Sequence, residues 1–80
     1  MPKHSDRADP ALAAALLSLR KQANRSQEDV AIRAGTTAGT LARIELAQTS
    51  PEWRTVRSIA AELGVSLRQL AIAVERAEQG

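Results

Sequence analysis

Apolar residues recur at helical spacing along most of the chain, in five short runs separated by turn residues. Leu12, Leu16 and Leu19 follow one another at intervals of three or four residues, which places them on one face of a helix. No stretch alternates between apolar and polar residues over the length of a strand. The pattern therefore predicts an all-α protein, built as a compact bundle of five short helices.

Most of the predicted helices have their own start signal. The predicted N-cap residues are Asp9, Ser26, Thr37 and Ser66. Each has a side-chain oxygen that can accept a hydrogen bond from a free backbone N–H at the start of the helix. Pro10 fits the first helical position, where a missing N–H is harmless. Asp29, three residues after Ser26, makes a capping-box variant. A loop over residues 49–52 precedes the fourth helix.

The predicted stops and inner faces complete the pattern. Asn24, Gly35 and Gly64 tolerate the left-handed backbone that ends a helix. The inner faces are expected to be Leu12, Leu16, Leu19 and Ala23; Val30, Ala31 and Ala34; Leu41 and Ile44; Val56, Ile59, Ala60 and Leu63; and Leu67, Leu70, Ala71 and Val74.

Composition limits what an 80-residue chain with this pattern can be. It has no cysteine, which excludes a disulfide scaffold, a Cys-ligated zinc site and a thiol nucleophile. The longest apolar run, Ala11 to Leu17, is far shorter than the roughly 20 residues of a membrane span. We expect no signal peptide and a cytoplasmic protein. The expected organisation is a flexible tail over residues 1–9, one domain over 10–76 and a frayed end over 77–80.

Several short motifs occur together in the middle of the chain, namely Ser26 to Ala31, Gly35 to Thr37, Leu41 to Glu45, Pro51, and Ile59 to Val65. In this combination the chain resembles the phage-repressor helix-turn-helix family (XRE type), typified by Cro and lambda repressor. The resemblance extends from Leu12 to Leu70. It implies a lambda-repressor-like fold in which the second and third helices form the helix-turn-helix, with the third as the recognition helix in the DNA major groove.

The resemblance also assigns contacts to DNA. The recognition helix would present Ala38, Gly39, Thr40, Ala42 and Arg43 to the bases. Arg43 has the strongest chemistry, since its planar guanidinium can grip guanine O6 and N7; the alternatives are a phosphate contact or a solvated side chain. Phosphate contacts are expected from Ser26, Gln27, Thr37, Arg25, Thr49, Ser50 and Arg54, with Arg57 beside them. Gln27 would in addition brace the recognition helix, whereas Arg25 is otherwise simply exposed.

Ala38 and Gly39 depart from the family, whose members commonly carry Gln, Ser, Arg or Asn there to bond base edges. Two interpretations follow. The small residues let the helix sit deeper, with Ala38 against a thymine methyl. Alternatively, the protein reads few bases itself and relies on Arg43, DNA shape or a partner protein.

Other residues are assigned structural or interface roles. The resemblance implies an inward ion pair between Arg20 and Glu45, linking the first helix to the third. Trp53, the one aromatic residue, is expected to cover the small core. In many family members the region around helices four and five forms the dimer contact, so Trp53 and Ile72 are also candidate dimer contacts. His4 is expected to be inert.

The excess positive charge lies in the helix-turn-helix segment and the residues beside it. The net charge of +2 divides into +3 for residues 20–57 and −1 for the rest of the chain. The sequence therefore predicts a DNA-binding transcriptional regulator, a repressor that binds double-stranded DNA as a homodimer. The alternative is a protein-interaction module on the same scaffold, antitoxin-like or dependent on a partner. Enzyme activity, cofactors and metals are not expected, because no catalytic cluster, phosphate loop or metal-ligand spacing is present.

Overall fold

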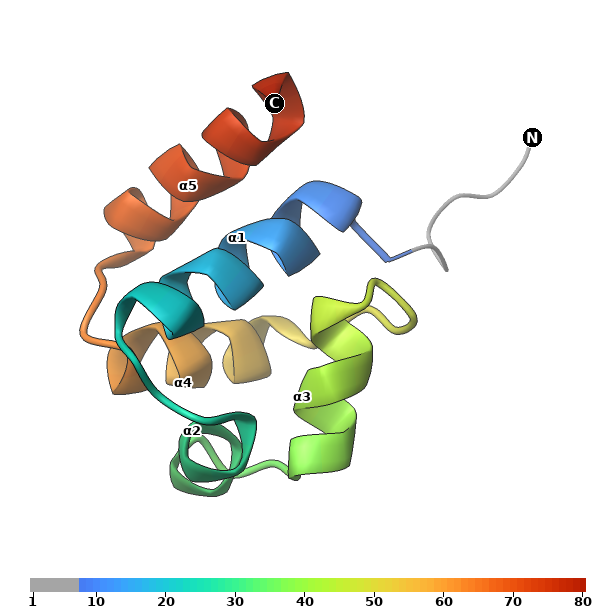
Figure 1. The fold of residues 1–80 in the computed structure, drawn as a ribbon, viewed down its shortest axis with the longest axis vertical. Helices are drawn as coiled ribbons and strands as arrows, with labels where there is room; N and C mark the ends of the chain where they lie inside the picture. Colours follow the sequence, from blue (N-terminus) through green and yellow to red (C-terminus); the bar gives the residue numbers. More distant parts are fainter. Residues whose placement is uncertain (1–7) are drawn as a thin grey trace.

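Five α-helices follow one another in the computed structural model, which describes residues 8–80. They are α1 (Pro10–Gln22), α2 (Gln27–Arg33), α3 (Ala38–Glu45), α4 (Trp53–Glu62) and α5 (Leu67–Gln79), and the described part of the chain contains no strand (Figure 1). The predicted all-α fold of five helices is confirmed. His4 and most of the predicted tail lie outside the described residues. At the other end, α5 continues to Gln79, beyond the expected domain boundary.

The helix starts have the predicted caps. The Asp9 carboxylate accepts hydrogen bonds from the N–H groups of Ala11 (2.9 Å) and Leu12 (3.3 Å). Ser26 and Thr37 each accept one from the third residue after them. Ser66 forms a complete capping box with Gln69, in which each side chain binds the backbone of the other. These bonds satisfy N–H groups that have no partner inside the helix.

Four helices end in one recurring turn. The residue at its centre has a positive φ: 59° at Asn24, 84° at Gly35, 59° at Ala47 and 74° at Gly64. In each case the next N–H donates to a carbonyl five residues earlier, as from Gln48 to Arg43 (2.8 Å). Three of these residues are predicted stops, but Ala47 is not, because its side chain disfavours this conformation and gives no sequence signal.

The core draws on every helix. Its buried side chains are Ala15 and Leu16 from α1, Val30 and Ala31 from α2, Leu41 and Ile44 from α3, Val56, Ile59 and Ala60 from α4, and Leu70 from α5. Full burial of one such Leu or Ile stabilises the fold by about 1.5–3 kcal/mol. Since no large aromatic side chain takes part, short helices with small side chains achieve this core by close approach.

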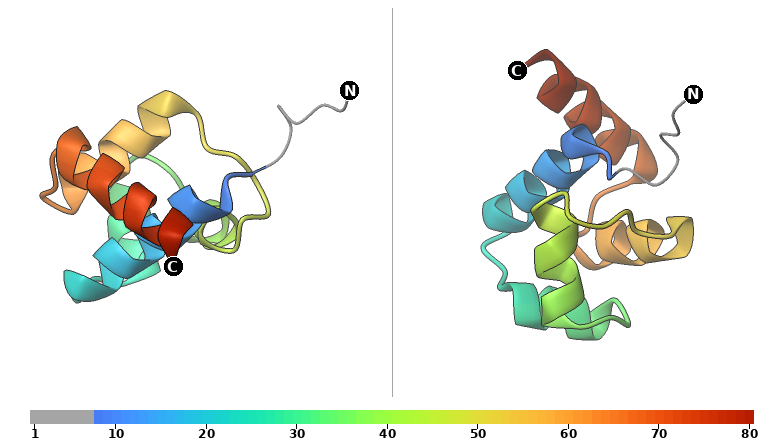
Figure 2. Two further views of the ribbon diagram at one scale, coloured as in Figure 1. Left: turned by 90° about the horizontal axis from the view of Figure 1, so that it is seen from above. Right: turned by 90° about the vertical axis from the view of Figure 1, so that its right-hand side faces the viewer.

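Four of the helices pack as two neighbouring pairs, α1 with α5 and α2 with α3 (Figure 1, Figure 2). α5 lies across α1, and this is the most extensive contact between two elements. α2 and α3 form the other extensive pair, with α4 between α2 and α5. The arrangement leaves the outer side of α3 uncovered by any other helix.

Some expected inner residues lie outside the core. Trp53 is 61% exposed, so the prediction that it covers the core is wrong. It is the first residue of α4, where the helix has made no turn that would carry the ring inward. Ala23, Leu67 and Ala71 are also exposed, whereas Leu70 is buried. The apolar stripe of α5 is narrower than its sequence suggests, because α5 packs mainly against α1 and only slightly against α4.

Candidate functional site

The α2–turn–α3 unit forms through local signals in the sequence. Ser26 caps α2, Gly35 turns the chain with a φ of 84°, and Thr37 caps α3. A side chain at position 35 would be strained by this φ, although space is available for its Cβ. The turn fixes the direction in which α3 leaves α2, and therefore which side of α3 faces outward.

A buried ion pair fixes the inner side of α3. Arg20 of α1 donates from Nε to Glu45 Oε2 (2.7 Å) and from Nη2 to Glu45 Oε1 (3.0 Å). Gln27 of α2 donates from Nε2 to Glu45 Oε1 (2.8 Å). Glu45 is only 7% exposed, and its hydrogen bond with Arg20 raises the pKa of the guanidinium. One carboxylate at the end of α3 thus joins three helices, and the ion pair expected from the sequence is present.

Gln27 is hydrogen-bonded to the end of α3. Its side chain is half-buried, and its amide donates to Glu45 instead of pointing into solvent. The amide oxygen makes no hydrogen bond within the described residues. It therefore stays available as an acceptor, while the brace limits where the side chain can reach.

Arg25 lies in a second ionic cluster. Its guanidinium donates to the Glu62 carboxylate (2.7 Å), to the Glu62 carbonyl (3.1 Å) and to the Asp29 carboxylate. Asp29 also accepts from Arg33 (3.3 Å), so the expected return bond of a capping box is replaced by two arginines. Arg25 joins α2 to the end of α4, and a phosphate would have to compete with these oxygens for it.

The acid stability of this cluster should depend on Asp29. The hydrogen bond from Arg25, reinforced by Arg33, lowers the pKa of the Asp29 carboxyl below its ordinary value. A depressed pKa contributes stability above the unfolded-state value, about pH 4, and that contribution is lost as the pH falls through the folded-state value. Urea unfolding between pH 7 and pH 3 should therefore show a smaller acid loss for Asp29→Asn than for the wild type. Equal losses would contradict this assignment.

The outer side of α3 carries the residues that the sequence assigns to DNA bases. Thr37, Gly39 and Arg43 are exposed, and Ala38, Thr40 and Ala42 are half-buried. Thr37 and Thr40 are joined through their hydroxyl oxygens (3.0 Å), and Arg43 Nη2 lies 3.5 Å from the Thr40 hydroxyl oxygen. Arg43 forms no ion pair among the described residues. The outer side of α3 therefore presents the polar groups of Thr37, Thr40 and Arg43. Beside them lie the small residues Ala38, Gly39 and Ala42.

Gly39 is not required by the packing of the protein. A Cβ at this position would meet nothing within 4 Å, and its φ is not in the left-handed region. Gly39→Ala should therefore raise the free energy of unfolding, by up to about 1 kcal/mol, because alanine loses less entropy in a helix. Chemical denaturation checks this, with Ala38→Gly as the matched control that should shift stability in the opposite direction. A loss of stability in Gly39→Ala would mean that the bare helix is needed for folding.

The loop after α3 carries the other expected phosphate contacts. Thr49 is half-buried and Ser50 is exposed, in the segment that joins the end of α3 to α4 (Figure 1). Arg54 and Arg57 are exposed on α4 and form no ion pair within the described residues. These side chains come from the loop after α3 and from α4, whereas Ser26 and Thr37 lie at the starts of α2 and α3.

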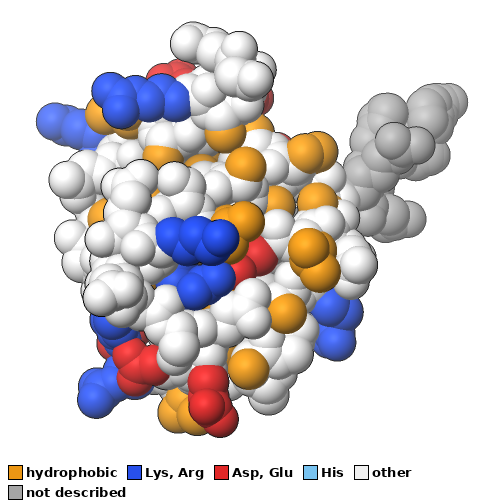
Figure 3. Space-filling model, viewed as in Figure 1, with side chains coloured by type: hydrophobic (Ala, Val, Ile, Leu, Met, Phe, Trp, Pro, Cys, Tyr) orange, Lys and Arg blue, Asp and Glu red, His pale blue; other side chains and the backbone are white. Residues whose placement is uncertain are grey.

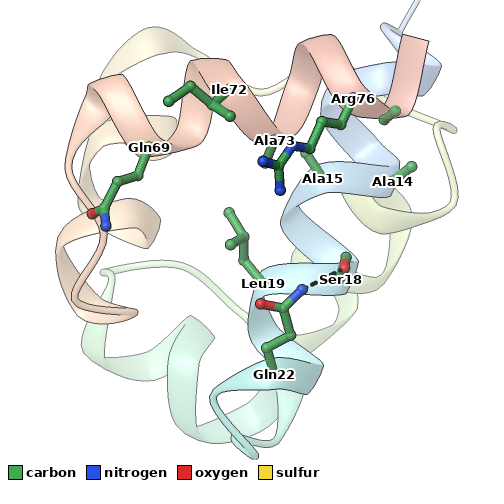
Figure 4. A pocket seen from close by; sticks show the side chains of 10 residues that line it. Ala14, Ala15, Ser18, Leu19, Gln22, Gln69, Ile72, Ala73 and Arg76 are labelled. Atoms are coloured by element: carbon green, nitrogen blue, oxygen red, sulfur yellow. Dashed lines mark hydrogen bonds between the residues drawn. The ribbon is translucent and has the colours of Figure 1, made fainter. Parts of the chain in front are cut away.

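The candidate dimer contacts lie on α4 and α5. Ile72 is 43% exposed and lines a groove of about 500 Å³ between α1 and α5, into which Leu19 points from α1 (Figure 4). Trp53 lines a separate, more apolar groove of about 470 Å³ with Leu67 and Val74. Ile32 and Leu46 are also exposed, and both lie outside the predicted inner faces of α2 and α3.

Charge is spread over the surface. On the face shown in Figure 3, basic side chains lie in several separate places, and acidic side chains adjoin some of them. The described residues contain no cluster of His, Asp or Glu that fits a metal ion, and none of their helices is long and apolar enough to cross a membrane.

Comparison with known proteins agrees with this geometry. A family model described as a helix-turn-helix domain matches residues 11–73. A crystal structure of the clp gene regulator ClgR from Corynebacterium glutamicum superposes with a TM-score of 0.83 at 23% identity, covering 88% of this chain and 74% of that one. A second structure of the same regulator gives 0.82 at 22% identity, covering 96% and 95%. At such identities the likeness establishes the fold. No curated protein matches the sequence.

Proposed function

Because the chain belongs to the helix-turn-helix domain family, we propose that it is a DNA-binding transcriptional regulator that inserts α3 into the major groove. The observation that carries the proposal is the asymmetry of α3. Its inner side is anchored by the buried pair of Glu45 with Arg20, while its outer side presents Thr37, Thr40 and Arg43. An element held firmly on one side and polar on the other is suited to reading a groove.

Contacts to bases and to phosphates have different roles in this proposal. Arg43 reads a base, guanine being the best match for its two parallel donors, and Ala38, Gly39, Thr40 and Ala42 lie against neighbouring base edges. Ser26, Gln27, Thr37, Thr49, Ser50 and Arg54 hold the phosphates and set the position of α3. Arg25 is the weakest member of the phosphate set, since Glu62 and Asp29 already occupy its guanidinium.

The same proposal includes a phage-repressor (XRE) type of domain that acts as a dimer and represses by occupying a promoter. A two-fold dimer would read half-sites about 34 Å apart, one helical turn of DNA. Two copies of a single recognition helix provide the specificity that one bare helix lacks. The structural relative ClgR is a gene regulator, which supports a role in transcription.

A selection of bound sequences from a random duplex library tests the proposal. We expect a site with two-fold symmetry and a guanine in each half, and binding that weakens steeply with salt because phosphate contacts release counterions. Enrichment of no sequence, together with no binding to mixed duplex DNA at micromolar concentration and low salt, would overturn it.

A protein-interaction module is the second candidate. The absence of polar side chains at Ala38 and Gly39 favours it, together with the exposed apolar side chains of Ile32, Leu46 and Trp53. Absence of DNA binding in the same titration would support this function, with an antitoxin-like or other partner protein covering those residues.

A further inference from the structure

A groove of about 470 Å³ lies where α1, the loop before α4, α4 and α5 meet. Its lining is mostly apolar and includes Leu12, Pro51, Val56, Leu70 and Val74. The volume falls within the range of about 300–1,000 Å³ that is typical of small-molecule sites. We call it the Trp53 groove, because the indole of Trp53 forms part of its lining.

Two features give the Trp53 groove a chemical preference. Trp53 is 61% exposed, so its ring is accessible to a ligand. Glu75 is the one charged residue among the described residues that line the groove, and it forms no ion pair within residues 8–80. The face of an indole and an unpaired carboxylate both attract a cation.

The basic residues next to Trp53 and Glu75 in sequence line other parts of the surface. Arg54 and Arg57 line a separate hollow on α4, which shares only Trp53 with the Trp53 groove. Arg76, the residue after Glu75, lines the groove between α1 and α5. The Trp53 groove therefore combines apolar and acidic residues, whereas the charged residues of the other two are basic.

A cation with an apolar body matches this lining better than other small molecules. The apolar side chains exclude water from the body of the ligand, and desolvation strengthens the attraction of a cation to an aromatic face. A primary ammonium is strongly hydrated, whereas a quaternary ammonium has an apolar exterior and has no N–H donors that need partners. An anion would be repelled by Glu75, and a neutral compound would gain nothing from its charge.

We propose that the Trp53 groove binds a small organic cation with an apolar body, of the quaternary ammonium class. Trp53 and Glu75 attract its charge, and the apolar lining covers its body. This site is separate from α3, so the inference goes beyond the proposed binding of DNA and does not depend on it.

Three compounds with the same alkyl chain test the preference for positive charge. Octyltrimethylammonium, octan-1-ol and octyl sulfate are each titrated below the micelle concentration while the emission of Trp53, the chain's one tryptophan, is followed. The ammonium should change the emission saturably and bind at least about tenfold more tightly than the other two. Circular dichroism confirms that the protein stays folded. Equal affinities, tighter binding of the alcohol or the sulfate, or no saturable change would each overturn the proposal.

Calorimetric titration of variants assigns the two residues. Glu75→Gln removes the charge at nearly constant size and should weaken binding of the ammonium by about fivefold, while binding of octan-1-ol stays unchanged. Glu78→Gln removes an exposed acid of α5 that does not line the groove, and as the matched control it should bind like the wild type. Equal losses in the two variants would show a general attraction to acidic surface and overturn the proposal.

Substitutions of Trp53 test the aromatic face separately. Trp53→Leu keeps an apolar side chain and should weaken binding of the ammonium by about tenfold, and Trp53→Phe should recover part of the loss. Wild-type affinity in Trp53→Leu would overturn the role of the ring.

A second copy of the chain is the other possible occupant of the groove, and sedimentation equilibrium distinguishes it. If the emission of Trp53 follows self-association and does not respond to the ammonium, the groove belongs to a second copy and the proposal is overturned. A response to the ammonium at constant protein concentration and constant sedimentation supports it. None of these measurements contains DNA, so a failure of the proposed function leaves their outcome unchanged.

Discussion

Glu45→Ala is expected to lower the free energy of unfolding by about 3–5 kcal/mol. The substitution removes both carboxylate acceptors of Arg20, which keeps only the Arg25 carbonyl (2.8 Å), and leaves a guanidinium, with a side chain only 12% exposed, without its counter-charge. It also removes the partner of Gln27, so α3 loses its side-chain hydrogen bonds to α1 and to α2 together. Since a small domain is stable by only about 5–15 kcal/mol, this is a large share of the total. Denaturant unfolding measures it.

Two further variants separate the buried charge from general effects of substitution. Arg20→Met/Glu45→Leu removes both charges and should be clearly more stable than Glu45→Ala, because no buried charge is left unpaired. Glu28→Ala, at an exposed position of α2, should change stability by less than about 0.5 kcal/mol. A loss below about 1 kcal/mol in Glu45→Ala would show that the pair does not hold α3 in place.

Arg43→Ala should weaken binding to the selected DNA site by about 1–3 kcal/mol per recognition helix, which is roughly 5–150-fold. Arg43 is exposed on the outer side of α3 and makes no ion pair among the described residues, so its donors are free for a base. The neighbouring Ala38, Gly39 and Ala42 have no polar side-chain atoms that could compensate. Repeating the sequence selection with the variant should relax the preference at one position of each half-site.

Controls distinguish base reading from simple loss of charge. Arg43→Lys keeps the charge but lacks the two parallel donors, so it should bind the site nearly as weakly as Arg43→Ala while retaining more affinity for random DNA. Arg76→Ala removes an exposed charge from α5, away from α3, and should have little effect (Figure 1). Equal losses on selected and random duplexes in Arg43→Ala would assign Arg43 to a phosphate instead.

Much of the fold could be predicted because its signals are local. Ser26, Thr37 and Ser66 cap the helices they precede, and Asn24, Gly35 and Gly64 have the left-handed backbone that ends them. These are properties of a few neighbouring residues, so the printed sequence contains them. Ala47 shows the limit: the turn there is imposed by the chain on either side, and alanine gives no sign of it.

The candidate site was predictable only in part. The pair of Arg20 with Glu45 and the outer position of Arg43 were both available through the resemblance. The contacts of Arg25 could not be predicted from the sequence. Its partner Glu62 is 37 residues away, and only the packing of α2 against α4 brings the two together. Trp53 is similar, because its burial depends on what packs against the start of α4, and there it lines an open groove with Leu67 and Val74 and stays 61% exposed.

The sequence by itself determined the number of helices, their approximate bounds and the side of α3 that carries Thr37, Thr40 and Arg43, because caps and apolar spacing act over one or two turns. The tertiary structure alone decided which charges are used inside the fold and which stay free. Glu62 forms an ion pair with Arg25, and Glu45 forms one with Arg20. Arg43, Arg68 and Glu75 form no ion pair within the described chain. The reason is that an ion pair needs two groups within a few ångströms, and only the packing of helices sets distances between residues far apart in the chain.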